Sequence, residues 1–173
     1  YVLNQHRGLM LVNLDTQVVV GQAPTYGYPR DLYLVGDRAY VLVASACNYR
    51  VEDGVIAWDV TSCLYVVDVS DPTLPVVESE FALNGDLVDS RMVGDILYAV
   101  CAEYEWYWDT ADGTVTADTA KTVLKAATSE SWVTSVNVAD PANIAVVDEL
   151  SFAGMGNVIQ ATNSAIFVAA HDE

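Results

Sequence analysis

The chain has 173 residues, of which 53% are hydrophobic and 18% are charged, and its formal net charge is −17. Such an apolar composition excludes a disordered chain, and such a negative charge disfavours binding to nucleic acid or docking on an anionic membrane. No apolar run reaches the ~18 residues of a membrane-spanning helix, so we expect no membrane insertion.

The first part of the chain, residues 1–26, predicts three short strands. Tyr-Val-Leu-Asn opens it, and the stretch LMLVNLDTQVVVGQ (9–22) has the two β-branched runs and the central polar turn of a hairpin. We expect this segment to lack the first strand of a four-stranded unit and so to form a partial one.

The next part, residues 27–84, predicts four strands. In DLYLVGDRAYVLVA (31–44) a Gly-Asp turn joins two apolar runs, because glycine readily supplies the positive φ of a tight hairpin. In LYVVDVSDPTLPVVESEF (64–81) an Asp-Pro turn joins two more, because proline fixes φ and cannot donate to a strand ladder.

Residues 85–153 repeat this order. The predicted strands are 87–93 and 96–102, joined at Gly94-Asp95, and then 132–138 and 144–152, joined at Asp140-Pro141. VGDILY (93–98) matches VGDRAY (35–40), and in two copies an aromatic follows the Asp-Pro proline by 26 residues, from 72 to 98 and from 141 to 167. Residues 154–173 begin another copy and contain its first two strands.

Repeated four-stranded units whose strands are apolar on both faces indicate sheets stacked face to face. We therefore predict an all-β fold, a fragment of a β-propeller of about three blades of four-stranded antiparallel sheet. The alternative is a β-sandwich, which does not need repeated copies. Closed propellers have ~4–8 blades, so we expect the rest of the propeller to lie outside this chain.

The stretches LYVVDVSDPTLPVV (64–77) and VDSRMVGDILYAV (88–100), with GMGNVIQATNSAIFVAAHDE (154–173), resemble a known family. They are similar to secreted bacterial and archaeal proteins with a C-terminal β-propeller domain distantly related to WD40 repeats, and to LVIVD-type propeller repeats. The resemblance implies a secreted or cell-envelope location. It transfers no catalytic residue.

Two connections between the second and third strands are longer than a hairpin needs, residues 45–62 and 103–131. Both are expected on the face around the mouth of the propeller channel. Long connections in a compact domain are usually functional or disordered, so we expect function on this face. A short helical turn within 119–127 is also expected.

Cys47 and Cys63 bracket the first insertion, and a disulfide between them is predicted because both lie at the ends of neighbouring antiparallel strands. Cys101 lies among apolar residues in the middle of a strand and is expected to be buried and free. The alternative for the pair is two unrelated thiols.

The second insertion carries the candidate binding residues. Aromatic side chains stack on sugar rings or grip partner proteins, or they hold an insertion against the propeller. The candidates are Tyr104, Trp106, Tyr107, Trp108 and Asp109.

Carboxylates in the same insertion are weak candidates for a calcium site, because hard cations prefer oxygen ligands. Their spacing is not that of an EF-hand, and the alternative is an ordinary Asp-Gly turn. Otherwise no cofactor is expected. The candidate ligands are Asp109, Asp112 and Asp118.

The sequence leaves three functions open. We favour a noncatalytic extracellular binding or scaffold module that engages a protein or glycan through the insertion face. The alternatives are part of a secreted enzyme whose active site at the channel mouth uses further blades, and a structural component of the envelope. Carboxylates around the channel would favour the enzyme.

Overall fold

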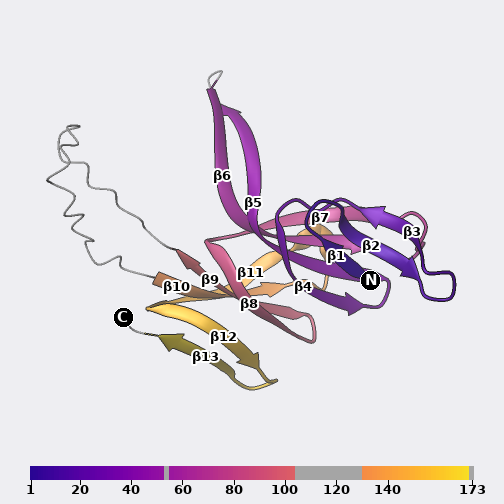
Figure 1. The fold of residues 1–173 in the computed structure, drawn as a ribbon. Helices are drawn as coiled ribbons and strands as arrows, with labels where there is room; N and C mark the ends of the chain where they lie inside the picture. Colours follow the sequence, from indigo (N-terminus) through magenta and orange to yellow (C-terminus); the bar gives the residue numbers. More distant parts are fainter. Residues whose placement is uncertain (53–54, 104–129, 172–173) are drawn as a thin grey trace, which may run out of the picture.

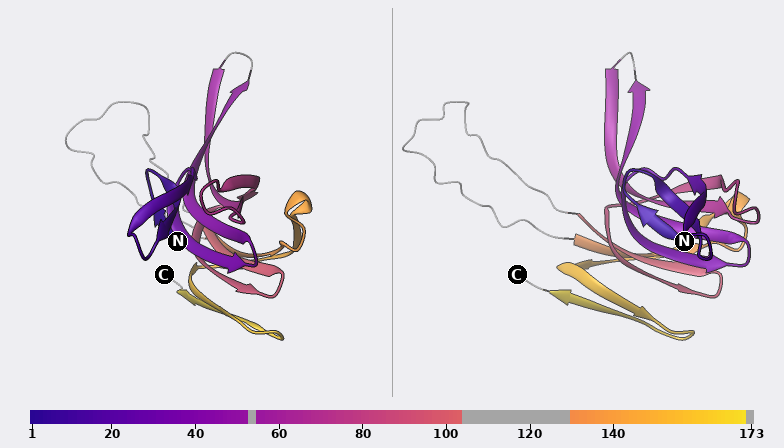
Figure 2. Two further views of the ribbon diagram at one scale, coloured as in Figure 1. Left: turned by 90° about the vertical axis from the view of Figure 1, so that its right-hand side faces the viewer. Right: turned by 45° about the vertical axis from the view of Figure 1, so that its right-hand side comes forward.

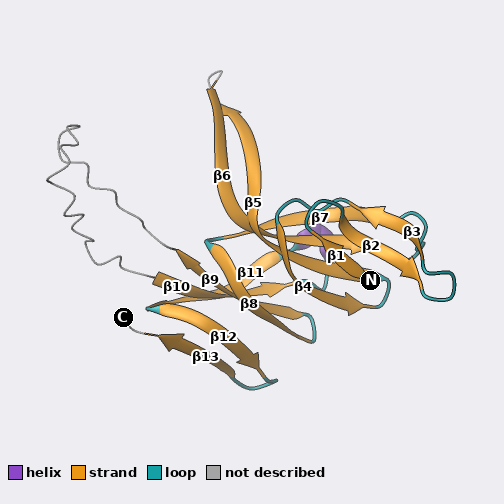
Figure 3. Cartoon of the chain, in the orientation of Figure 1, coloured by secondary structure: helices purple, strands orange, loops and turns teal. Residues whose placement is uncertain are grey.

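The computed structural model describes residues 1–52, 55–103 and 130–171. Within these ranges every regular element is a β-strand, except for one turn of 3-10 helix at Pro141–Asn143. The strands form four separate antiparallel sheets, which confirms the predicted all-β propeller fragment (Figure 1; Figure 3). The expected turn within 119–127 lies outside the described residues.

The first sheet has three strands, β1 (Val2–Asn4), β2 (Gly8–Asn13) and β3 (Val18–Ala23), in the order β1-β2-β3. Asparagine side chains close both of its turns. Asn4 Oδ1 accepts hydrogen bonds from the backbone N–H groups two and three residues further on, and Asn13 Oδ1 does the same.

The second sheet has the order β4-β5-β6-β7, with β4 at Tyr28–Val35, β5 at Arg38–Glu52, β6 at Val55–Asp68 and β7 at Val76–Leu83. The third sheet has the order β11-β10-β9-β8. Its strands are β8 (Asp86–Val93), β9 (Ile96–Glu103), β10 (Glu130–Asn137) and β11 (Ala145–Ala153).

The four strands predicted for this third sheet are confirmed to within two residues at each end. The last sheet pairs β12 (Met155–Ala161) with β13 (Ile166–His171).

The turns form as their residues predict. Gly36 and Gly94 have φ of +56° and +57° in the two Gly-Asp hairpins. In the Asp-Pro turns the aspartate side chains accept local hydrogen bonds: Asp71 from the backbone and hydroxyl of Thr73, and Asp140 from Ala142 N and Asn143 Nδ2. These bonds lower the pKa of both carboxyls and hold the chain where it reverses.

The first insertion differs from the expected loop. Residues 45–62 continue β5 and β6 as a paired two-stranded ribbon, with the register kept from Ala46↔Thr61 to Glu52↔Val55. Figures 1 and 2 show this ribbon extending away from the stacked sheets. β-Branched and aromatic residues favour strand pairing over an irregular loop. The composition of this connection was therefore a better guide to its structure than its length.

The sheets pack face to face through side chains from alternate positions of the same strand. In β5, Val41 and Val43 lie in a core with Leu9 and Leu11 of the first sheet. Leu42, between them, lies in a second core with residues of β9 and β10 in the third sheet. A third, smaller core joins Val100 and Val133 to Ile159 of β12. The second and third sheets are thus each enclosed on both faces, as in stacked blades.

We expect Leu42→Ala to destabilise the protein by about 2–5 kcal/mol, because Leu42 is fully buried between two sheets and its loss leaves a cavity. Leu74→Ala is the matched control, since Leu74 is 69% exposed in the Asp-Pro turn. Urea unfolding followed by circular dichroism measures both. Equal midpoints would contradict the stacked core.

Candidate functional site

The face predicted to carry function is defined by four strand ends: the ends of β5 and β9 and the starts of β6 and β10. We call it the insertion face. β5 and β9 occupy equivalent places in neighbouring sheets, so both long connections leave the stack at the same edge.

Ser45 sits at the root of the ribbon in an unusual conformation. Its φ is +50°, and the register shifts between Val43 and Ala46. Asp86 of the third sheet holds it: Asp86 Oδ1 accepts from Ser45 N at 3.2 Å and from Ser45 Oγ at 3.4 Å. Non-glycine residues rarely adopt left-handed backbone dihedrals, and such a conformation at a bulge persists only where the surrounding structure stabilises it. The neighbouring sheet therefore anchors the point where the ribbon departs.

Two buried serines join successive sheets beneath the insertion face. Ser62 Oγ donates to Gly85 O at 3.0 Å and accepts from Leu87 N at 2.6 Å. Ser131 Oγ repeats the pattern, donating to Gly154 O at 2.8 Å and accepting from Gly156 N at 2.9 Å. Each serine satisfies two backbone groups in the crossing to the next sheet.

Sequence reasoning missed these serines, although the signal was present. Each one precedes a glycine by 23 residues, 62 to 85 and 131 to 154. Both glycines have positive φ, +75° at Gly85 and +92° at Gly154, so the crossing requires them.

A second polar network lies on the first strands of the second and third sheets. Asp31 and Asp89 each directly follow a bulge, in β4 and β8. Asp31 Oδ2 accepts from Ser90 Oγ in the next sheet, and Asp89 Oδ2 accepts from Ile159 N in the sheet after that at 3.0 Å. An aspartate at the equivalent place in each of two successive sheets thus bridges to the next sheet.

Tyr33 and Arg91 complete this network. The Tyr33 hydroxyl is 2.9 Å from Ser90 Oγ; because Ser90 donates to Asp31, Tyr33 is the donor. Burial raises the pKa of Tyr33 and the Asp31 charge adds to this rise, so the phenol is neutral near pH 7. Arg91 Nη1 donates to Asp89 Oδ1 at 2.8 Å. These groups are engaged with one another, which is typical of a structural network.

The positions of the cysteines bear on the predicted disulfide. Cys63 is a buried free thiol opposite Val43, whereas Cys47 lies opposite Val60. Three further residues along the strand amount to about 10 Å, beyond the Cα separation of a disulfide. The structure therefore does not show the predicted Cys47–Cys63 bond, because the ribbon keeps its register where a closing loop was expected. Cys101 is buried and free as predicted, and burial raises the thiol pKa to about 11 in Cys63 and about 12 in Cys101.

The predicted binding and metal residues of the second insertion lie outside the described residues. These are Tyr104, Trp106, Tyr107, Trp108, Asp109, Asp112 and Asp118. Their attachment points are described: β9 ends at Glu103 and β10 begins at Glu130, on the insertion face. Elsewhere in the described chain no three His, Cys, Asp or Glu residues gather as metal ligands do.

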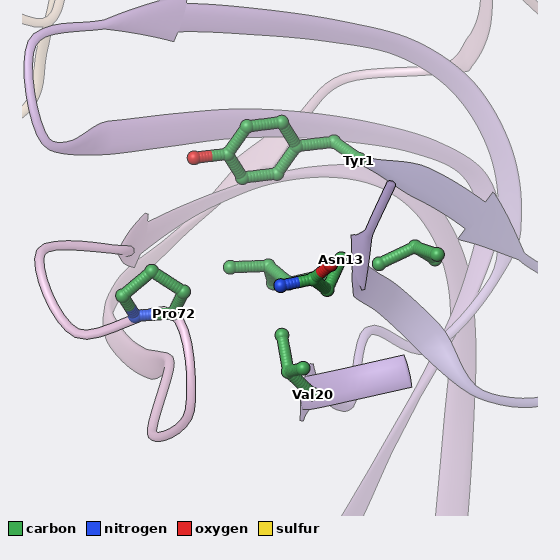
Figure 4. Close-up of a pocket in the computed structure, with 6 residues that line it drawn as sticks. Tyr1, Asn13, Val20 and Pro72 are labelled. Atoms are coloured by element: carbon green, nitrogen blue, oxygen red, sulfur yellow. The ribbon is translucent and has the colours of Figure 1, made fainter. Parts of the chain in front are cut away.

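A hollow of about 290 Å³ opens between the first sheet and the Asp-Pro turn of the second (Figure 4). Tyr1, Asn13, Val20 and Pro72 line it, with two further apolar residues of β2. The described part of the chain brings no titratable cluster to this hollow. It lies away from the insertion face and is a shallow apolar gap between adjoining sheets.

Repeated antiparallel sheets stacked face to face, with their long connections at one edge, define a propeller-type module. The chain matches the β-propeller domain family over residues 1–171 and belongs to it. A search of curated proteins and a search of solved structures each found no match. No helix in the described ranges is long and apolar enough to span a membrane.

We expect Ser62→Ala to cost about 1–3 kcal/mol, because it leaves buried Leu87 N and Gly85 O without their partner. Ser131→Ala is expected to cost a similar amount. Ser164→Ala, in the exposed turn between β12 and β13, is the control. The urea unfolding midpoints of the three variants are compared. If Ser62→Ala and Ser131→Ala lower the midpoint no more than the control does, the bridging role is contradicted.

We expect no disulfide in the chain. Intact-mass measurement after alkylation in denaturant without reductant should show all three cysteines modified. Under native conditions at pH 8, Cys63 and Cys101 should react slowly, because burial raises the pKa of both thiols and little thiolate forms. A mass gain of one label in denaturant, rising to three after reduction, would restore the Cys47–Cys63 bond.

Proposed function

We propose that the chain is a noncatalytic binding or scaffold module that engages a protein or glycan through its insertion face. One observation carries this proposal: both long connections leave neighbouring sheets at the same edge, where one forms a paired ribbon. Function concentrates where loops are mounted together on a rigid scaffold.

The aromatic stretch of the second insertion supplies the chemistry. We propose Tyr104, Trp106, Tyr107, Trp108 and Asp109 as the contact residues. Clustered aromatics present a large stacking surface at low entropic cost, and a nearby carboxylate adds hydrogen-bond acceptors. Asp109, Asp112 and Asp118 are the residues that would hold calcium if the module takes a cation, and oxygen ligands suit that ion.

The alternative function, an enzyme with its site at the channel mouth, draws on Asp31 and Asp89, which are carboxylates on the first strands. Their contacts favour the structural role. Asp31 accepts from Ser90 and Asp89 from Ile159 N and Arg91. A general acid or base must reach its substrate, and these groups are already engaged between sheets. A purely structural envelope role remains the third candidate.

We also propose that further blades pack against β11 and that the protein acts outside the cytoplasm. The outer strands of the earlier sheets are covered by the next Asp-Pro turn: Pro72 approaches Gly21 of β3, and the 3-10 turn contacts β7. By contrast, Val146, Val147 and Leu150 of β11 are 49%, 59% and 66% exposed. The exposed apolar residues of β11 support the packing of further blades there. The sequence resemblance supports a location outside the cytoplasm.

The test replaces Trp106 and Trp108 by alanine and measures binding on a glycan array and to immobilised envelope proteins. We expect both variants to lose binding while Tm barely changes, because the aromatics serve the ligand. Tyr26→Ala is the matched control, since Tyr26 is a 67% exposed aromatic of the described chain. A Tm lowered by several degrees with binding intact would show that the tryptophans hold the insertion in place.

A further inference from the structure

The crossing from β7 to β8 carries an asparagine followed by a glycine, Asn84 and Gly85, the one such pair in the 173-residue sequence. Asparagine is a chemically labile residue. Its side-chain amide can be attacked by the backbone nitrogen of the next residue, and glycine exposes that nitrogen most because it has no side chain to shield it. The attack needs an accessible asparagine and a backbone N–H that is free of hydrogen bonds.

The structure meets both requirements at this crossing. Asn84 is exposed. The strand ladders end at Leu83 and resume at Asp86, so the two residues between them are outside both ladders. Across the described ranges, no backbone hydrogen bond outside the strands uses the N–H of Gly85. The attacking nitrogen and the side-chain amide are therefore both available.

Other asparagines of the described chain are held by hydrogen bonds. Asn4, Asn13 and Asn137 each accept a bond from a backbone N–H through Oδ1. The side-chain amide of Asn143 donates to Asp140. Such bonds fix the side chain and keep its carbonyl carbon away from the following backbone nitrogen. Their side chains are therefore protected in a way that the structure does not show for residue 84.

This place in the fold needs the glycine but does not need the asparagine. Gly85 directly precedes β8, as Gly27 and Gly154 directly precede β4 and β12, and all three have positive φ. A Cβ atom at position 85 would also lie 3.1 Å from Ala102 O. In the other two crossings the residue before the glycine is tyrosine or alanine. The fold thus retains Gly85, and only the residue before it makes this crossing reactive.

We propose that Asn84 is a site of spontaneous deamidation and backbone isomerisation. Hydroxide removes the proton from Gly85 N, and this nitrogen forms a bond with Cγ of Asn84. The bond from Cγ to Nδ2 then breaks, and Nδ2 takes a proton from water and leaves as ammonia.

Water next opens the cyclic imide at one of its two carbonyls. Cleavage at Cγ gives an aspartate in the original backbone. Cleavage at the main-chain carbonyl gives isoaspartate, in which the backbone runs through Cβ and Cγ. One water is consumed and one ammonia is released, with no oxidation or reduction.

The isoaspartate product weakens the junction between the second and third sheets, because it adds one carbon to the backbone directly before the bridging groups. Ser62 Oγ donates to Gly85 O at 3.0 Å and accepts from Leu87 N at 2.6 Å. Asp86, between them, accepts from Ser45 N at the root of the ribbon. A longer backbone shifts these groups relative to their partners, and hydrogen bonds weaken steeply when their geometry is lost.

The first test is incubation of the 173-residue protein at pH 8, followed by peptide mapping with fragmentation that separates aspartate from isoaspartate. We expect both products at position 84 before any product at Asn163, which is exposed but is followed by serine. They should form faster at pH 9 than at pH 6, because the attacking nitrogen must lose its proton. Asn84→Ala, which copies the equivalent residue of the next crossing, should lose the signal.

The second test compares the purified isoaspartate form with Asn84→Asp, which carries the same charge on an unaltered backbone. We expect faster hydrogen exchange at Ser45 and Leu87 and a lower urea midpoint in the isoaspartate form alone. No product at position 84, or products forming equally at all exposed asparagines, would overturn the proposed site. Equal exchange in the two forms would overturn the weakening of the junction.

Discussion

The structure depends on strands that are apolar on both faces. In β5, odd-numbered residues from Ala39 to Val43 pack toward the first sheet, and even-numbered residues from Tyr40 to Ala44 pack toward the third. Neither face can be left in water without losing several kcal/mol of apolar burial. A sheet of this kind is stable only between two others, so the stacking of blades follows from the composition of the middle strands.

Apolar contact alone does not fix how one sheet is set on the next, and the polar groups between sheets supply that register. Ser62 and Ser131 bridge the crossings on one side of the stack, while Asp31 and Asp89 bridge the first strands. Each lies at an equivalent place in successive units and satisfies groups that burial would otherwise leave unpaired. Carboxylates near a propeller channel therefore need not indicate catalysis.

The sequence predicted the fold closely because turns and strands are local signals. The Gly-Asp and Asp-Pro turns and the four strands of the third sheet could be placed from residue type alone. The disulfide and the first insertion could not, because both depend on pairing register: a bulge at Ser45 and continued pairing to Glu52 separate Cys47 from Cys63. The bridging serines were missed because they act on glycines far along the chain, and spacing between repeats carried the only signal.

The ribbon and the blade from which it extends are continuous in the chain but differ in what stabilises them. Within the blade, each strand of the β5–β6 pair has neighbours on both edges and both faces, so apolar residues at every position are satisfied. Beyond Ala46 the same two strands no longer pair with β4 and β7. The insertion face therefore rests on a base set by contacts between sheets, from which these two strands continue as a pair.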